Sequence, residues 1–275
     1  MWRRVDIFNR MEKFITANNC ALRISDTLRG DSVVVLLHGY LESIEVWDDF
    51  IPLLKAHFRV VAPDLPGHGI SEVRGPVHTM EFMADTVAAA LTTLGIDKFL
   101  LVGHSMGGYV ALELLRKYPE RLTGLVLLHS TPNPDGEAKK EARLREIELV
   151  EQGKKDLMAR MNVEKRFAAD NLQKFADTID ELAMQVTLTE EDGVTAALRG
   201  MMERRDNNAT MRNSPVPQLV ILGRRDEHIS AEVAEALVAA QPQAQVVWLD
   251  NSGHMGFIEE PERCAEAIIQ LKVES

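Results

Sequence analysis

The chain has little cysteine and no long apolar run. Its 275 residues include only two cysteines, Cys20 and Cys264, which are too few and too far apart in sequence for a disulfide framework or a zinc site. No stretch approaches the ~20 apolar residues that span a bilayer, and the amino-terminal MWRRVDIFNRMEKF lacks the apolar segment of a signal peptide. We therefore expect a cytoplasmic protein with no membrane association.

Basic residues are also in deficit. The chain has 31 Lys and Arg against 42 Asp and Glu, which gives a formal charge of -11 at pH 7. A surface of this sign does not neutralise phosphates, so the composition argues against nucleic-acid binding. The hydrophobic fraction of 45% and the charged fraction of 27% are typical of a globular protein. The length is sufficient to bury one large core.

Six short apolar runs recur along the chain, and helix-period segments lie between most of them. The runs are continuous in Val and Leu, which indicates strands buried on both faces of a largely parallel sheet covered by helices. They are SVVVLLHG, FRVVAPDL, KFLLVGHS, LTGLVLLHS, PQLVILGRRD and AQVVWLD. The earlier FITANNCALRISDT alternates around Asn18-Asn19 and predicts an antiparallel hairpin at the sheet edge.

Residues 131–213 interrupt this alternation of strand-like and helix-period segments. They contain no Val/Ile-rich run, are dense in charge and helix formers, and have the Pro-rich stretches TPNPDG and NSPVP at their two ends. We predict a helical cap of about four helices here, inserted into a core domain of residues 1–130 and 214–275. Half of the twelve methionines fall in this cap, where we favour helix packing over an adaptable apolar pocket. They are Met158, Met161, Met184, Met201, Met202 and Met211.

The strongest chemical signal is the stretch VGHSMGG, in which one serine is surrounded by glycines. Residues 103–107 fit G-x-S-x-G, and this pattern needs the apolar run that precedes it and the helix-period MGGYVALELLRKY that follows it. In such a sharp turn the serine takes a strained backbone conformation, and its small neighbours let strand and helix pass closely. We predict that Ser105 is a nucleophile; the alternative is a glycine-rich turn with a chance serine.

A serine hydroxyl needs a base at neutral pH, and the base needs an acid to orient it. We select His254 as the base, because it follows the last strand-like run and precedes a helix opened by Pro261. The other seven histidines are less suitably placed. His38 and His104 lie in glycine motifs, His68 and His78 in early loops, His57 in an amphipathic helix, His129 at a strand end, and His228 beside the acid candidate.

The acid candidate is Asp226, in LVILGRRDEH, just past the carboxyl end of a strand-like run. The chain order Ser105, Asp226, His254 is that of a Ser, Asp/Glu, His arrangement. Two rivals remain: Asp135, in the loop after the preceding run, and Glu227 next door.

The oxyanion that forms when serine attacks a carbonyl needs preformed donors, normally two backbone N–H groups. We expect one from Met106, directly after the nucleophile. The second should come from Tyr40, in the loop after VVVLLHG, where Gly39 allows a sharp turn. The side chains of Met106 and Tyr40 are incidental to that role.

Taken together, these stretches resemble the α/β-hydrolase fold family. HGY at 38–40, DLPGHGIS at 64–71, GHSMGG at 103–108, GRRD at 223–226 and SGH at 252–254 match its landmarks in order, over nearly the whole chain outside the cap. The resemblance implies an eight-stranded, mostly parallel sheet whose first strands are antiparallel. It also implies Ser105 as nucleophile, Asp226 as acid, His254 as base, and Tyr40 and Met106 as oxyanion donors.

In this family DLPGHGIS is a structural turn near the cleft. We therefore interpret Asp64, His68 and Ser71 as residues that hold a loop rather than as chemical groups.

Relatives of this fold that are haloalkane dehalogenases or epoxide hydrolases carry an aspartate nucleophile, so Ser105 excludes those activities. We expect a serine hydrolase that cleaves a carboxylic ester, or a thioester or lactone, of a small to medium apolar acyl group. The alternatives are carbon–carbon bond hydrolysis, lyase or perhydrolase chemistry, and a ligand-binding protein without turnover.

The cap is expected to roof the nucleophile and select the substrate. Tyr40, Leu41 and Met255 are our candidates for pocket lining, and Arg204 or Arg205 for meeting a substrate carboxylate. No ligand pattern for a metal and no dinucleotide or P-loop spacing is present in the sequence, so we expect no cofactor and no metal. The oligomeric state is not readable from the sequence.

Overall fold

The structure is a computed structural model that describes residues 10–271. Both ends of the predicted core domain, residues 1–9 and 272–275, lie outside the described residues. A single eight-stranded sheet runs through the molecule in the order β1-β2-β4-β3-β5-β6-β7-β8. Its strands are β1 (Met11–Ala17), β2 (Cys20–Asp26), β3 (Val33–Leu37), β4 (Arg59–Pro63), β5 (Phe99–His104), β6 (Leu122–Leu128), β7 (Gln218–Gly223) and β8 (Gln245–Leu249).

The sheet has the predicted direction of strands. β3 to β8 pair in parallel, while β1 pairs antiparallel with β2, and β2 antiparallel with β4. The edge hairpin turns at Asn18 and Asn19, whose φ angles of 50° and 56° are both in the left-handed region. A two-residue turn of this type matches the twist of the flanking strands, and asparagine tolerates the conformation. The predictions of the fold class and of the hairpin are confirmed.

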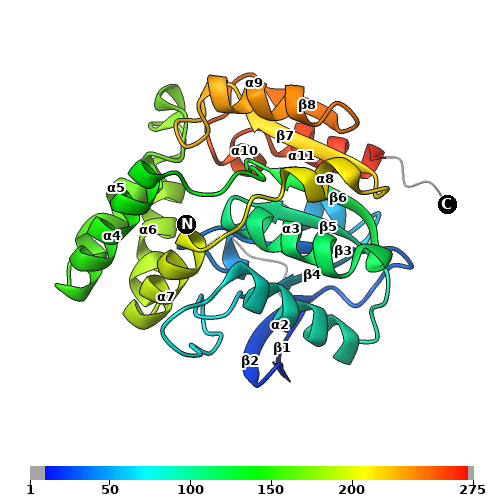
Figure 1. The fold of residues 1–275 in the computed structure, drawn as a ribbon, viewed down its shortest axis with the longest axis horizontal. Coiled ribbons are helices and arrows are strands. Elements are labelled where there is room, and N and C mark those ends of the chain that lie inside the picture. Colours follow the sequence, from blue (N-terminus) through cyan, green and yellow to red (C-terminus); the bar gives the residue numbers. More distant parts are fainter. Residues whose placement is uncertain (1–9, 272–275) are drawn as a thin grey trace.

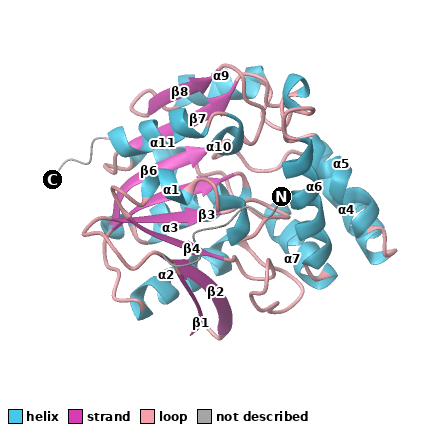
Figure 2. Ribbon diagram, turned by 180° about the vertical axis from the view of Figure 1, so that it is seen from behind, coloured by secondary structure: helices cyan, strands magenta, loops and turns pink. Residues whose placement is uncertain are grey.

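Helices cover both faces of the sheet, so its central strands are buried on both sides. The side chains of Val34 to Leu37 and of Leu125 to Leu128 have no exposed surface. α3 packs on β3, β5 and β6 and contacts α2 and α8, whereas α1 contacts α11. Figures 1 and 2 show these two groups in front of and behind the sheet. The helices of the core are α1 (Ile51–Leu54), α2 (Met80–Thr93), α3 (Met106–Lys117), α9 (Ala231–Ala240), α10 (Gly256–Glu259) and α11 (Pro261–Gln270), with short 3₁₀ turns η2 (Ile44–Trp47) and η3 (Pro119–Arg121).

The segment between β6 and β7 is helical and contains no strand. It forms α4 (Glu137–Glu151), α5 (Lys155–Glu164), η4 (Ala169–Asn171), α6 (Ala176–Leu188), α7 (Glu191–Met202) and α8 (Asn208–Asn213). α4 packs on α7 and α5 on α6, and this group stands beside the sheet at the left of Figure 1. The segment thus has five α-helices rather than about four. The unforeseen α8 packs on α3, against the core.

The parallel pairing brings five loops to one edge of the sheet. Leu37 pairs with Gly103, His104 with Leu128, Leu128 with Ile221, and Gly223 with Leu249. The loops that follow β3, β5, β6, β7 and β8 therefore begin side by side. Ligand sites of open α/β sheets form at this carboxyl edge. Among residues 10–271, no helix is both long and apolar enough to cross a bilayer.

Candidate active site

Ser105 lies in the turn between β5 and α3. Its φ of 51° and ψ of -114° place a non-glycine residue in a strained region, as the glycine pattern predicts. The two flanking glycines are needed for close packing. A Cβ on Gly103 would lie 2.6 Å from the Cα of Gly108, and one on Gly107 would lie 2.6 Å from the carbonyl oxygen of His38. No side chain fits either position without moving backbone.

The structure brings Ser105, His254 and Asp226 together in one hydrogen-bonded line. Nε2 of His254 lies 2.9 Å from Oγ of Ser105, and Nδ1 lies 2.7 Å from Oδ2 of Asp226. Because the carboxylate can only accept, Nδ1 carries the proton and Nε2 is free to accept the serine proton. This is the tautomer that a general base beside a serine requires.

The environment of Asp226 keeps it ionised. Burial works against the charge, but the neighbouring rings of His254 and His129 outweigh it and hold the pKa of Asp226 well below its usual range. The second carboxylate oxygen, Oδ1, accepts the backbone N–H groups of His228, at 2.7 Å, and Ile229, at 3.1 Å. The acid is therefore a fixed negative charge.

Burial also lowers the pKa of His254 to about 4, against the opposing pull of Asp226. The ring is consequently neutral at pH 7, as a base must be.

His129, at the end of β6, shares the carboxylate of Asp226 with His254. Its Nδ1 lies 3.3 Å from Oδ2 of Asp226, and its Nε2 accepts the backbone N–H of Gly256 at 3.2 Å. Because Nε2 accepts, Nδ1 must carry the proton and donate to Asp226. Sequence reasoning placed His129 at a strand end but gave it no role. Its position could have indicated a role, because His129 follows β6, and β6 lies between the strand that precedes the nucleophile and the strand that precedes the acid.

Neither rival acid forms a hydrogen bond or ion pair with His254 in the described part of the chain. Asp135 is buried and holds Arg143, with Oδ2 2.6 Å from Nε, and Arg204, with Oδ1 2.5 Å from Nη1. Glu227 is exposed. The structure therefore brings only Asp226 of the three carboxylates to the base.

The expected oxyanion donors lie at the predicted positions. Met106 is the first residue of α3, where backbone N–H groups have no partner within the helix. Tyr40 lies in the loop after β3, and its hydroxyl donates to Glu146 on α4 at 3.0 Å. Of the other pocket candidates, Leu41 has a φ of 59° and Met255 is fully buried in the core. The roles of these four residues stay predictions.

The other sequence candidates are placed as follows. Asp64 accepts the backbone N–H groups of Ile44 and Ile70, and Ser71 donates to the carbonyl of Asp64, so DLPGHGIS holds a loop. His57 lies in the turn after α1 and not in a helix, since α1 already ends at Leu54.

The cap candidates differ in burial. Arg204 stacks on Tyr109 with its Cζ 4.0 Å from the ring centroid, and Arg205 pairs with Glu81. Met201 and Met211 are buried, as helix packing predicts, whereas Met161 and Met184 are exposed. No substrate contact is assigned to these two arginines or these four methionines.

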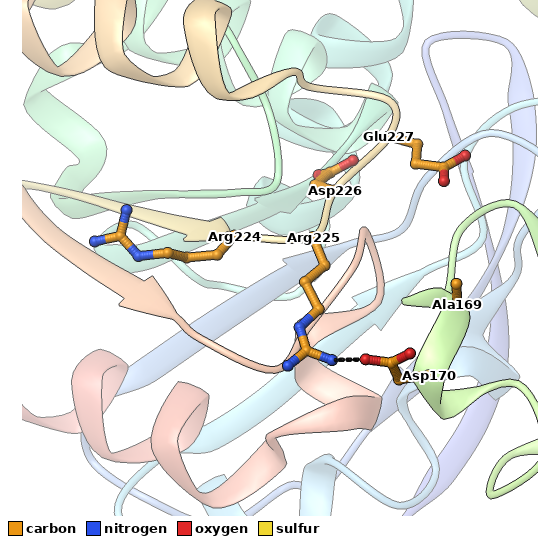
Figure 3. Close-up of a pocket in the computed structure, with 6 residues that line it drawn as sticks. All are labelled: Ala169, Asp170, Arg224, Arg225, Asp226 and Glu227. Carbon is orange, nitrogen blue, oxygen red and sulfur yellow. Dashed lines mark hydrogen bonds and ion pairs between the residues drawn. The ribbon is translucent and has the colours of Figure 1, made fainter.

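A surface hollow of about 320 Å³ lies on the outer side of the acid loop (Figure 3). In it Arg225 reaches across to Asp170 of η4, with Nη1 2.6 Å from Oδ2, while the carboxylate of Asp226 points away from this pair. Its lining residues do not include Ser105, so we do not assign it to the substrate. They are Ala169, Asp170, Arg224, Arg225, Asp226 and Glu227.

Within residues 10–271, one group of side chains has the spacing of a metal site: His129, Asp226 and His254, whose ligand atoms lie within 4.8 Å of one another. Their atoms already hydrogen-bond one another, with Ser105 and Gly256 as further partners. Both rings direct a protonated Nδ1 at the carboxylate, which is the arrangement of a hydrogen-bonded group rather than of deprotonated ligands.

A mostly parallel sheet with a strained serine turn at its carboxyl edge defines a class of α/β enzymes. Residues 34–267 match the alpha/beta hydrolase family. The chain belongs to this family.

Individual relatives agree with that assignment. The pimeloyl-[acyl-carrier protein] methyl ester esterase of Aromatoleum aromaticum is 31% identical over 250 residues, which cover 86% of this chain and 96% of that esterase. A thermophilic esterase from Thermogutta terrifontis matches with a TM-score of 0.88 and 34% identity, over 94% of this chain and 96% of that one. The enol-lactonase of Burkholderia xenovorans LB400, at 22% identity and a TM-score of 0.86 over 95% of this chain and 100% of that one, shares the fold.

Proposed function

We propose that the protein hydrolyses carboxylic esters with Ser105 as nucleophile, His254 as general base and Asp226 as the orienting acid. The observation that carries this proposal is the unbroken line of hydrogen bonds from Ser105 Oγ through His254 to Asp226. Ester hydrolysis is also the activity for which two relatives above 30% identity, those from Aromatoleum aromaticum and Thermogutta terrifontis, are named.

In the proposed mechanism, each step belongs to a named atom. His254 Nε2 takes the hydroxyl proton as Ser105 Oγ attacks the ester carbonyl carbon, and the resulting oxyanion accepts the N–H groups of Met106 and Tyr40. The tetrahedral intermediate collapses to an acyl-enzyme, and His254 returns the proton to the departing alcohol. Water then attacks the acyl carbon, giving its proton to His254, and the carboxylic acid leaves as Ser105 regains its proton.

We further propose that residues 131–213 form a cap over this site and set the acyl chain length. One contact supports this: the hydroxyl of Tyr40, in the loop of the oxyanion donor, binds Glu146 of α4. The substrate class is then a small to medium ester whose acyl group lies between the loop after β3 and the inserted helices.

The test is turnover of p-nitrophenyl esters from acetate to decanoate, together with labelling by a fluorophosphonate. We expect a burst of nitrophenol and covalent labelling in the native chain. Ser105→Ala should abolish labelling and lower kcat by about 10⁶. Ser230→Ala, which changes an exposed serine at the start of α9, is the matched control. Retention of turnover and labelling by Ser105→Ala would overturn the proposal.

A further inference from the structure

Arg166 lies after α5 and contacts two loops of the core at once. Its side chain is only 8% exposed. Nη1 donates to Oε1 of Glu42 at 3.0 Å, and Nη2 donates to the backbone carbonyl of Tyr40 at 2.9 Å. The backbone carbonyl of Arg166 accepts the N–H of His254 at 2.6 Å. One residue of the insertion thus touches both the loop of the oxyanion donor and the loop of the base.

Glu42 is the buried partner of this guanidinium. Besides Arg166, its carboxylate accepts the N–H of Gly39 at 2.6 Å and receives Nδ1 of His104 at 2.9 Å, both on Oε2. Gly39 directly precedes the oxyanion donor, and His104 directly precedes the nucleophile. The donors around Glu42 favour its ionised form, which can only accept hydrogen bonds.

His104 completes the connection to the base. Its Nε2 lies 2.9 Å from the backbone carbonyl oxygen of His254, and its Nδ1 faces Glu42. Both partners are acceptors in this arrangement, so each ring nitrogen of His104 is placed to donate a hydrogen bond. Its other neighbours are the rings of His254 at 5.1 Å, His129 at 6.2 Å, Trp47 and Phe257.

We propose that Arg166, Glu42 and His104 form a positioning network that holds the loops of the nucleophile, the base and the oxyanion donor in register. The inference rests on the proposed esterase function. Each loop comes from a different strand, and within residues 10–271 no hydrogen bond joins the loop after β3 directly to the loop after β8, so Arg166 and His104 make the connection. A displacement of about 1 Å in such a site costs about a hundredfold in rate, so the network is placed to act on kcat.

Further contacts of the insertion support this placement. Glu259 of α10 accepts the N–H of Ala168 at 2.9 Å and the N–H of Gly253 at 2.8 Å. Residues 166–168 therefore lie against residues 252–254 through backbone and side-chain bonds. In this proposal the insertion contributes Arg166 as a positioning residue of the site, and its helices contact the substrate separately.

The kinetic test compares Arg166→Met, Arg166→Lys and the control Arg160→Met. Arg160 lies on α5 and pairs with Asp180 at 2.5 Å, but its side chain is 57% exposed. We expect Arg166→Met to lower kcat by ten- to a hundredfold with KM changed less than about threefold. Lysine can meet Glu42 but lacks the planar fork that bridges to Tyr40, so it should restore only part of kcat. Each rate is divided by the concentration of active sites, which is measured by fluorophosphonate titration. A lower kcat per active site then reports displaced catalytic loops and not a larger fraction of misfolded protein.

A second measurement does not depend on turnover. In ¹⁵N-edited NMR of the histidine rings, His104 of the native chain should show two protonated nitrogens, and His104→Gln should identify its signals. Glu42→Gln should remove or shift the Nδ1 proton. A neutral His104 ring, or an unchanged kcat in Arg166→Met, would overturn the proposal. If the native chain cleaved no ester, the proposed function would fail, and the ring signals would still decide whether this network exists.

Discussion

Nδ1 of His129 lies 3.3 Å from Oδ2 of Asp226, the same oxygen that holds the ring of His254. The carboxylate thus receives two imidazole N–H groups and two backbone N–H groups. Four donors fix its orientation and its charge.

Replacing His129 should leave the Asp226 carboxylate in place but hold it less firmly. His129→Leu deletes one donor to a buried carboxylate, a bond worth about 1.5–3 kcal/mol, so we expect kcat to fall on the order of tenfold. His129→Asn, whose amide can take the place of Nδ1, should lose less. Steady-state kinetics of the two variants on p-nitrophenyl acetate checks this order, and equal rates for the two would contradict the role given to the ring.

The two buried aspartates should respond differently to the same change. Asp226→Asn replaces the acceptor Oδ2 that faces Nδ1 of His254 with an amide NH₂ donor, which favours the wrong tautomer of His254, and we expect kcat to fall by about 10⁴. Asp135→Asn leaves the buried side chain of Arg204 without its charge partner, which should cost about 3 kcal/mol of stability instead. Kinetics together with chemical denaturation distinguishes the two. A crippled kcat in a stable Asp135→Asn would move the acid to that residue.

The activity should extend to low pH. His254 must be neutral to accept the serine proton, and its pKa is lowered to about 4, so protonation stops the reaction only below that value. We expect kcat/KM to be level from pH 8 to about 5 and to fall about tenfold per pH unit below 4. Initial rates are measured with circular dichroism at each pH to exclude unfolding. A midpoint near 6.5 would show that burial does not control this base.

The serine turn should not tolerate a methyl group. Gly107→Ala places a Cβ 2.6 Å from the carbonyl oxygen of His38, which forces backbone apart and should cost about 1–3 kcal/mol of stability. Gly136→Ala is the matched control, because a Cβ there has no neighbour within 4 Å. Thermal unfolding and kcat of both variants are the measurements. A Gly107→Ala variant with the melting temperature and kcat of the native chain would show that close packing does not restrict this position.

Much of the architecture was predictable because it depends on local pattern. Continuous Val and Leu runs mark strands buried on both faces, and Asn18-Asn19 marks the hairpin. Ser105, Asp226 and His254 were found because each follows a strand-like run, and parallel strands bring such positions to one edge. Their catalytic roles remain predictions, but their proximity follows from the sheet.

The features that the sequence did not predict are those that depend on contacts between residues far apart in the chain. Glu42 and Arg166 are charged residues that a pattern assigns to the surface, yet each is buried because the other neutralises it, 124 residues away. Met161 and Met184 are apolar residues that the helical spacing predicts to be packed, yet they are exposed. Helical spacing predicts a packed face but does not tell which face of the helix is buried.

The sequence alone therefore determined the class of fold, the turn of the nucleophile and the three residues of the proposed triad, since strand periodicity and chain order carry that information. The tertiary structure decided which histidines support Asp226 and how Arg166 joins the loops of Tyr40 and His254. A buried charge is stable only when it has an ion-pair or hydrogen-bond partner. Partners far apart in sequence can be identified only in the folded chain.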